Sequence, residues 1–232
     1  MDKITKDNFI TKHLGTKSFI GKNIEKEKDL LEINRLKKPF FLTIKNKKKL
    51  NKAYRKKLNA KLVCKLINFE KISQGKEKSI LNCRKVRKKD ATEIKKIALE
   101  KTSNSRFFND KKLPSHFREN IRKNWVMNFF SKKRGDEMIV ALNKNKKILG
   151  FLLLKINKKK LIVDILATRK KSQNLGVATS LINYINNKFM YKKNVTLIAG
   201  TQSDNTSAKN FYKKNGFIEM NMIYVYHKHF FI

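Results

Sequence analysis

The sequence has 232 residues, which is enough for one large domain or two small ones, each with a hydrophobic core. Hydrophobic residues make up 40% of the chain, a fraction typical of a globular protein rather than a disordered one. No apolar run reaches the ~18 residues that a membrane span needs, and the opening residues lack the apolar core of a secretory signal. Because Cys64 and Cys83 have no metal-type spacing, we expect a cytoplasmic protein with two idle thiols and no metal.

The formal net charge of +39 suggests a nucleic-acid partner, but the composition argues against one. Residues encoded by A/T-rich codons are abundant and Gly and Pro are scarce, so a biased genome accounts for much of the lysine. The basic residues are also spread along the whole chain instead of gathering on one helix beside stacking aromatics. We therefore consider nucleic acid unlikely, and an anionic small substrate, linked to a nucleotide or to coenzyme A, fits the charge better.

The first 80 residues predict a small α/β layer. Residues 39–44 and 61–69 are rich in aromatic and β-branched side chains, as strands are, and residues 47–58 between them have helical spacing. The polar stretch 73–78 is the best candidate for a linker. The chain therefore divides into a small N-terminal α/β domain, 1–80, and a larger domain, 81–232.

The second region begins with strand and helix signals. Residues 83–87 predict a strand, and Asp90 with Glu93 predicts a capping box at the start of a helix. Pro114 suits the first turn of another helix. The buried stripe that we expect on this helix consists of Phe117, Ile121, Trp125, Val126 and Phe129.

Strands and helices then alternate to the C-terminus. The patterns predict a hairpin of residues 138–142 and 148–156, a third strand at 161–166, a helix over 177–189, a strand at 195–199 and a helix over 205–214. Gly216 is well placed to follow the last helix. Residues 218–226 alternate as a strand, with Ile218, Met220, Met222, Tyr224 and Tyr226 on one face.

The segment Gln173-Asn174-Leu175-Gly176-Val177-Ala178 lies between a strand and a helix. The first amides of a helix are unpaired and carry a partial positive charge, so they suit a pyrophosphate. Gly176 allows the backbone to approach the phosphates, and Ala178 keeps the helix start small. Taken alone, the segment is equally compatible with an ordinary tight turn.

A second motif removes that ambiguity. Residues 205–217 read Asn-x-x-Ala-x-x-x-Tyr-x-x-x-Gly-Phe, and together with the Gln-x-x-Gly-x-Ala loop they resemble the GNAT acetyltransferase superfamily. The resemblance implies a mixed, mostly antiparallel α/β sheet flanked by helices, and acetyl-CoA as acyl donor. The coenzyme contacts it implies are Ile165, Leu166 and Ala167 on the preceding strand, Gln173, Asn174, Leu175, Gly176, Val177, Ala178 and Thr179 in the loop and helix start, and Asn205. The loop departs from the commonest version by lacking Arg at its first position and Gly at its last.

A looser resemblance extends over nearly all of the chain. Segments 105–110, 124–126 and 200–205 look like the dTDP-fucosamine acetyltransferase group, whose members acetylate a 4-amino sugar carried on a nucleotide. Residues 1–80 are similar in length and layout to the small N-terminal domain of that group. The resemblance implies a cytoplasmic step that supplies surface polysaccharide.

The superfamily's chemistry assigns roles to single residues. Tyr212 matches the tyrosine that protonates the departing thiolate, although a core aromatic is the simpler alternative. A backbone donor near Leu166 is expected to stabilise the oxyanion. Asn205 contacts the coenzyme, caps its helix, or does both.

Arg106 is the candidate contact for a phosphate or carboxylate of the acceptor, against the alternative of a solvated surface arginine. His116 is more consistent with a structural role than with a base, and neither His227 nor His229 is assigned a function.

Three functions therefore remain from the sequence. The first is N-acetylation of a nucleotide-linked amino sugar. The second is acetylation of a protein N-terminus or another small amine by the same fold, and the third is a basic binding module without catalysis. Pairing of exposed strand edges into a homodimer is also left open.

Overall fold

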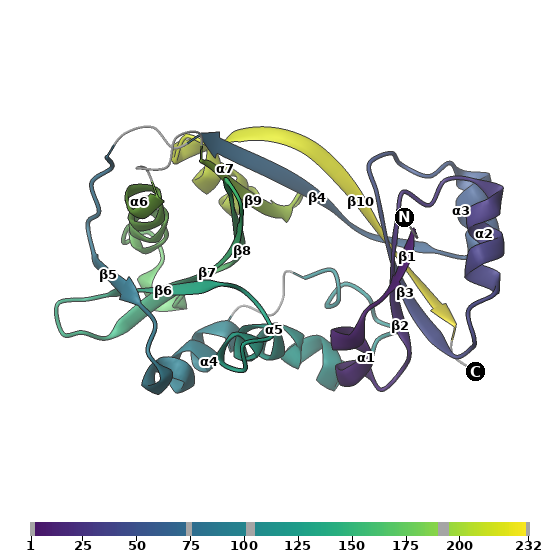
Figure 1. Ribbon diagram of the computed structural model, residues 1–232, viewed down its shortest axis with the longest axis horizontal. Helices are drawn as coiled ribbons and strands as arrows, with labels where there is room; N and C mark the ends of the chain where they lie inside the picture. Colours follow the sequence, from purple (N-terminus) through teal and green to yellow (C-terminus); the bar gives the residue numbers. More distant parts are fainter. Residues whose placement is uncertain (1–2, 73–75, 101–104, 190–194, 231–232) are drawn as a thin grey trace.

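The computed structural model describes residues 3–72, 76–100, 105–189 and 195–230. Within these ranges the elements are β1 (Ile4–Lys6), α1 (Asn8–Leu14), β2 (Ser18–Lys22), α2 (Glu27–Asn34), β3 (Phe40–Asn46), α3 (Lys52–Leu58), β4 (Lys61–Ile72), β5 (Asn82–Lys85), η1 (Lys88–Asp90), α4 (Ala91–Leu99), α5 (Ser115–Phe130), β6 (Glu137–Leu142), β7 (Ile148–Asn157), β8 (Lys160–Thr168), η2 (Lys170–Ser172), α6 (Val177–Phe189), β9 (Thr196–Gln202), α7 (Thr206–Lys214) and β10 (Ile218–Phe230). Figure 1 shows them in an elongated arrangement with both chain ends at the same end of the molecule.

All ten strands of the described residues form one sheet in the order β1-β2-β3-β10-β4-β9-β8-β7-β6-β5. Most neighbours are antiparallel, and the parallel pairs are β2 with β3 and β8 with β9. Helices pack on both faces, as the alternation along β7 requires. Leu152 and Leu154 face the core under α6 and α7, whereas Phe151 and Leu153 face the core under α4 and α5. The predicted fold class, a mostly antiparallel sheet flanked by helices, is confirmed.

Two long strands join the N-terminal part to the rest of the molecule. β4 pairs with β10 over most of its length and with β9 through residues 66–72, and β10 also pairs with β3 through residues 224–230. Figure 1 shows both strands running across the molecule between the helices α6 and α7 and the helices α2 and α3. The division at residue 80 stays a prediction, but β4 from the first part is an interior strand of the second part's sheet.

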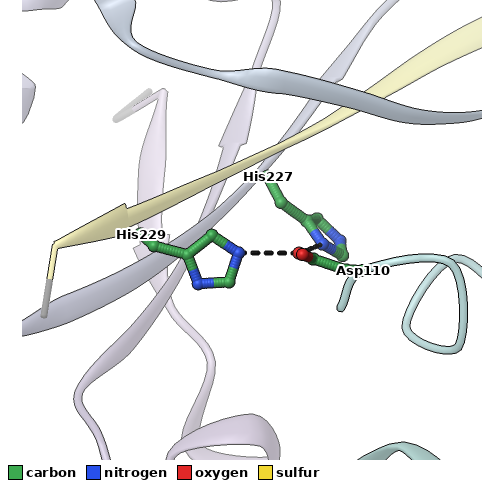
Figure 2. A group of neighbouring side chains, drawn as sticks. All are labelled: Asp110, His227 and His229. Atoms are coloured by element: carbon green, nitrogen blue, oxygen red, sulfur yellow. Dashed lines mark hydrogen bonds and ion pairs between the residues drawn. The ribbon is translucent and has the colours of Figure 1, made fainter. Parts of the chain in front are cut away.

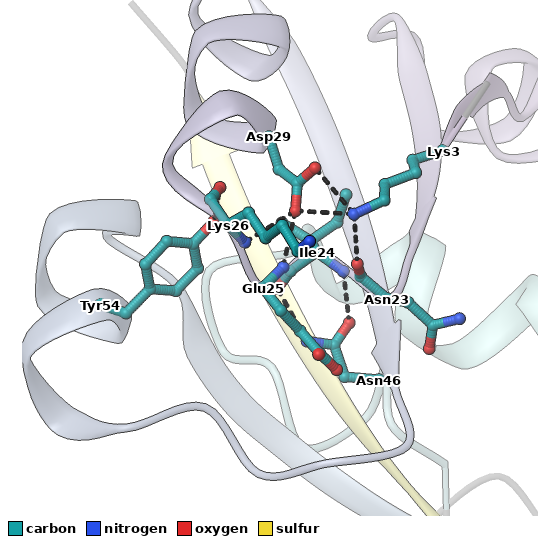
Figure 3. Close-up of polar contacts among 8 residues, drawn as sticks. All are labelled: Lys3, Asn23, Ile24, Glu25, Lys26, Asp29, Asn46 and Tyr54. Carbon is teal, nitrogen blue, oxygen red and sulfur yellow. Dashed lines mark hydrogen bonds and ion pairs between the residues drawn. The ribbon is translucent and has the colours of Figure 1, made fainter.

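A polar network stabilises the N-terminal part (Figure 3). The buried Asp29 carboxylate accepts hydrogen bonds from the Lys3 ammonium at 2.8 Å and from the backbone amides of Glu25 and Lys26 at 2.7 and 2.8 Å. Burial opposes ionisation of Asp29, but these hydrogen bonds outweigh it and lower the pKa of the carboxyl. The Asn46 amide also bonds both backbone groups of Ile24, at 2.9 and 2.8 Å, so the turn after β2 is fixed to β3.

Several local predictions are wrong at the ends of elements. The helix predicted over 47–58 begins only at Lys52, because Asn51 is its N-cap and accepts a hydrogen bond from the Tyr54 amide at 2.7 Å. The capping box of Asp90 with Glu93 does not form. Asp90 instead accepts from the Arg87 amide at 2.7 Å and pairs with Arg84, and its carboxylate is therefore unavailable to the helix.

The apolar face predicted for residues 218–226 is also not a single face. Ile218 and Met220 are 71% and 52% exposed, whereas Tyr226 is buried. An irregularity between Glu219 and Met222 adds a residue of β10 against β4, so the alternation of residues 218–220 does not continue into the rest of the strand. The elements β1, α1, β2 and α2 were not predicted, because their short apolar stretches carry little periodic signal.

Candidate active site

The loop before α6 has the backbone geometry of an anion site. Asn174 and Gly176 both adopt positive φ angles, 63° and 69°, which turn the chain sharply from η2 into the helix. The first hydrogen bond of α6 runs from the Ser180 amide to the Gly176 carbonyl, at 2.9 Å. Helix geometry therefore leaves the amides of Val177 to Thr179 without a partner inside the helix, and the dipole makes this end attractive to a phosphate.

The segment that enters β5 lies along α6 and touches this loop. Ser180 Oγ accepts from the amides of Ile80 and Leu81 at 3.2 and 3.1 Å, and the Asn183 amide donates to the Lys78 carbonyl at 2.9 Å. A Cβ atom at Gly176 would lie 2.9 Å from Ile80 Cδ1. The positive φ at position 176 favours glycine, and the Ile80 side chain leaves little room there for a Cβ atom. Close approach of a phosphate is therefore not the only reason for glycine at this position.

Strands β8 and β9 separate beside this loop. They pair from Lys160 to Ile162 with Thr196 to Ile198, and the following half of β8 has no strand partner on that side among the described residues. Ile165, Leu166 and Ala167 lie in this open half and pair with β7 alone. An irregularity places Asp164 out of register with β7, and such bulges turn a strand away from its neighbour. The open backbone edge can hydrogen-bond an extended ligand.

Arg122 of α5 reaches the open half of β8. Its guanidinium nitrogen lies 3.4 Å from the Leu166 carbonyl oxygen. Helix α5 therefore places the Arg122 cation beside the part of β8 for which the resemblance implies coenzyme contacts.

Tyr212 of α7 is buried on the other side of the open edge. Its ring stacks on Phe69 of β4 at 5.2 Å and contacts Phe217 at 5.3 Å, within the same apolar cluster as Val177 at the start of α6. Burial raises the pKa of the phenol, so its proton is retained at neutral pH. A protonated phenol can act as a proton donor, and the aromatic contacts are equally consistent with a residue that only packs in the core.

Asn205 caps α7. Its Oδ1 accepts from the Ala208 amide at 3.2 Å and its Nδ2 donates to Thr201 Oγ1 at 3.1 Å. The capping interpretation is thus visible in the structure, and a coenzyme contact by the same side chain remains a prediction.

Arg106 is not a solvated surface arginine. Its guanidinium carbon lies 4.3 Å from the Phe107 ring and 5.6 Å from the Trp125 ring, and burial lowers its pKa. Its Nε is inaccessible and has no hydrogen-bond partner among the described residues. His116, by contrast, is exposed at the start of α5.

The structure brings together three residues for which no role is predicted from the sequence (Figure 2). Asp110 Oδ2 lies 2.7 Å from His227 Nδ1 and 2.7 Å from His229 Nε2, and all three side chains are almost completely buried. Burial opposes the ionised carboxylate, yet the two imidazoles hold the pKa of Asp110 well below its usual range. The spacing of two histidines on one strand face was the only signal available in the sequence, because Asp110 is 117 residues away.

These three side chains are of the types that bind Zn²⁺ or Fe²⁺, and their ligand atoms lie within 4.8 Å of one another. The contacts are, however, hydrogen-bond lengths, and they already use one oxygen of Asp110 and one nitrogen from each ring. His227 Nε2 has no hydrogen-bond partner among the described residues, whereas metal-bound histidines normally have one. The three side chains therefore form hydrogen bonds that hold β10 to the loop that carries Arg106.

A groove of about 820 Å³ lies behind the loop, between α6 and the end of α7. Thr179 and Asn183 line it on one side, and Lys214, Asn215 and Gly216 line it on the other. Lys71, Lys78 and Glu77 also line it, and Lys71 pairs with Glu77, so the groove carries charges of both signs. No helix in the described part of the chain is long and apolar enough to cross a membrane.

Comparisons with known proteins concern the domain and its fold. Residues 134–219, from the residues before β6 to the start of β10, match the family model for the acetyltransferase (GNAT) domain. No curated protein matches the sequence.

Three solved structures illustrate the similarity in fold. A functionally unknown conserved protein from Staphylococcus epidermidis has a TM-score of 0.71 at 14% identity, covering 98% of this chain and 94% of that one. A GCN5-related N-acetyltransferase from Sphaerobacter thermophilus has a TM-score of 0.62 at 11% identity, covering 99% and 76%. A tandem GNAT protein from the clavulanic acid biosynthesis pathway has a TM-score of 0.53 at 9% identity, covering 82% and 64%. At these identities the likeness concerns the fold alone.

Proposed function

We propose, on the premise that this chain carries a GNAT acetyltransferase domain at residues 134–219, that it transfers the acetyl group of acetyl-CoA to the 4-amino group of a nucleotide-linked amino sugar. Acetyl-CoA is the acyl donor of the GNAT family. The single observation that supports the activity best is the open half of β8 next to the free amides at the start of α6. The strand edge suits the pantetheine arm, and the helix start suits the pyrophosphate.

The residues of the chain then have separable tasks. The backbone around Leu166 holds the thioester carbonyl and polarises it, so that the carbonyl carbon is open to attack by a neutral amine. The ammonium of the acceptor loses one proton to water before attack, its nitrogen loses a second proton as the C–N bond forms and the C–S bond breaks, and the departing sulfur takes up a proton. Tyr212, whose phenol stays protonated, is the donor that we assign to that sulfur. Asn205 fixes the helix on which Tyr212 lies.

The choice of a nucleotide-linked sugar rests on two features. Segments 105–110, 124–126 and 200–205 are similar to those of acetyltransferases that modify such sugars. In addition, the strands of the N-terminal part continue the GNAT sheet, which gives the acceptor side more surface than a small single domain has.

A thiol-release assay tests this proposal. Acetyl-CoA would be offered with 4-amino sugars linked to nucleotides, the same sugars without nucleotide, and short peptides with free N-termini. We expect saturable turnover with the first group and little with the others. Turnover of peptides alone would identify a protein acetyltransferase, and an absence of saturable acetyl-CoA binding by calorimetry would rule out the enzyme altogether.

A further inference from the structure

A row of three residues crosses the junction between the N-terminal strands and the GNAT sheet. Lys45 of β3 lies opposite Val225 of β10, which lies opposite Cys64 of β4. Residues directly opposite each other on neighbouring strands point to the same face, so Lys45 and Cys64 flank the buried Val225. His227, two residues along β10, points to that face as well.

The loop that carries Arg106 covers this face. Phe107 stacks on His227, with ring centres 5.5 Å apart, and packs with Phe41 of β3 in one apolar cluster. Asp110 holds the same loop to His227 and His229 through its two hydrogen bonds (Figure 2). Arg106 is therefore presented by a loop that is anchored at several points, which lowers the entropy cost of using its guanidinium to bind a ligand.

The cations on this face have little negative charge to balance them. The pKa of Lys45 is lowered to about 8, first by burial and then by the nearby charges of Arg106 and Lys22. Burial also raises the pKa of the Cys64 thiol to about 11, so Cys64 is uncharged at neutral pH. Asp7 is the carboxylate that favours both cations, and its Oδ1 already accepts from the Ile10 amide at 2.9 Å.

Neither cation has an ion-pair partner among the described residues. The pairs that do form nearby involve other basic residues, such as Arg134 with Asp164 at 2.6 Å. Two half-buried cations in one place destabilise the folded protein unless an anion joins them. A bound phosphate or carboxylate would offset that cost by pairing with both cations.

We propose that Arg106 and Lys45 together bind an anionic group, a phosphate or a carboxylate, on the acceptor substrate. This inference rests on the proposed acetyltransferase function and adds to it a role for the N-terminal part. Lys45 comes from β3 of that part, so the first 80 residues contribute directly to acceptor recognition.

The position of α5 relates this anion site to the site of transfer. Arg122 contacts the Leu166 carbonyl, and Trp125, three residues later, contacts Arg106. Residues three apart lie on one side of a helix, so the two side chains leave α5 about one turn apart, ~5 Å along the axis. An acceptor can thus place its anion on Arg106 and Lys45 while its amine points toward the open half of β8.

The test compares Lys45→Met and Arg106→Gln with wild type, and Lys47→Met serves as the matched control because Lys47 is exposed and carries the same charge. Thiol release would be followed with an amino sugar, its 1-phosphate and the corresponding amino uronic acid. We expect KM for the anionic acceptor to rise about tenfold to a hundredfold in both site variants, since a charged hydrogen bond contributes about 1.5–3 kcal/mol. Acetyl-CoA affinity should stay within about twofold of the wild-type value, because neither substitution lies in β8 or in the loop before α6.

A preference for the phosphate or for the uronic acid identifies the anion. Equal KM values for neutral and anionic acceptors in wild type, or unchanged KM values in both site variants, would overturn the anion site. Calorimetry with glucose 1-phosphate, which has no amine, gives a readout that does not depend on transfer. Binding that is retained in Lys47→Met and lost in both site variants supports the site even if acetyl transfer is absent, in which case only the proposed function fails.

Discussion

Burial decides the chemistry of the single residues that matter most. Tyr212 keeps its proton and His227 stays neutral because the charged form of each would lose its hydration. Arg106 keeps its charge but has lost access to water at Nε. The neighbours of each side chain thus decide its role: we propose Tyr212 as a proton donor and Arg106 as an anion ligand, whereas His227 donates a hydrogen bond to the Asp110 carboxylate.

Replacing Tyr212 with Phe removes the phenol and leaves the ring stacked on Phe69. We expect turnover to fall by about 10²-fold or more, the usual contribution of a positioned acid, while the dissociation constant for acetyl-CoA stays nearly constant. Single-turnover kinetics and calorimetry measure the two quantities. Tyr54→Phe is the control, because it also removes a buried hydroxyl, one that donates to the Lys26 carbonyl far from the open strand edge. Equal loss of turnover and affinity in Tyr212→Phe would make Tyr212 a structural residue.

His227 makes stability depend on pH in a defined window. Its pKa is lowered from 6.5 to about 4, chiefly by burial, so the unfolded chain takes up a proton between these values and the folded one does not. Stability should therefore be complete above pH 6.5 and fall as the pH drops toward 4, by up to about 3 kcal/mol at 1.36 kcal/mol per unit. Urea unfolding of wild type, His227→Gln and His116→Gln at several pH values measures the effect. The slope should shrink only in His227→Gln, and an identical slope in all three proteins would contradict the burial argument.

At the scale of elements, short-range geometry forms the turn that we propose for the pyrophosphate, whereas long-range pairing forms the open strand edge that we propose for the pantetheine arm. The turn before α6 is defined by two positive φ angles and a helix start within a few residues. The open half of β8 depends on how β8, β9 and β4 meet, which involves residues more than 90 apart in the sequence.

Valine at Gly176 should strain the backbone and hinder the amides of α6. A non-glycine residue in the left-handed region costs about 1–2 kcal/mol, so the melting temperature should fall in the free protein. Gly15→Val is a matched control, since Gly15 has a φ of 74° at the end of α1 and no atom within 4 Å of its added Cβ. Both variants should be destabilised, but only Gly176→Val should lose the rise in melting temperature that acetyl-CoA produces. A full ligand-induced rise in Gly176→Val would place the pyrophosphate elsewhere.

At the scale of the whole molecule, the net charge of +39 favours non-specific binding of polyanions, separately from binding at specific sites. Non-specific binding to duplex DNA should be detectable at low salt and weaken linearly on a log–log plot, reaching dissociation constants of about 10⁻⁴ to 10⁻⁶ M at physiological salt. Acetyl-CoA binding should remain saturable at physiological salt, because it depends on contacts with the edge of β8 and the start of α6 as well as on charge. Fluorescence anisotropy with labelled DNA and calorimetry with acetyl-CoA at matched salt separate the two. Tight, sequence-dependent DNA binding at high salt would instead favour the basic binding module.

The sequence by itself determined the local parts of this protein. The turn at residues 173–176, the helix after it, the strand 161–166 and the cap at Asn205 depend on residues close together in the chain, so their patterns are legible without the fold. Errors occurred where a side chain found a better partner nearby, as Asp90 did with Arg84 and Asn51 did as an N-cap.

Only the tertiary structure decided the rest. The insertion of β4 between β9 and β10, the contact of Asp110 with two histidines, and the packing of the Arg106 loop on the sheet face beside Lys45 all join segments far apart in sequence. Such pairings depend on which apolar faces pack together and on the cost of closing long loops, and neither quantity is written in a local pattern of residues.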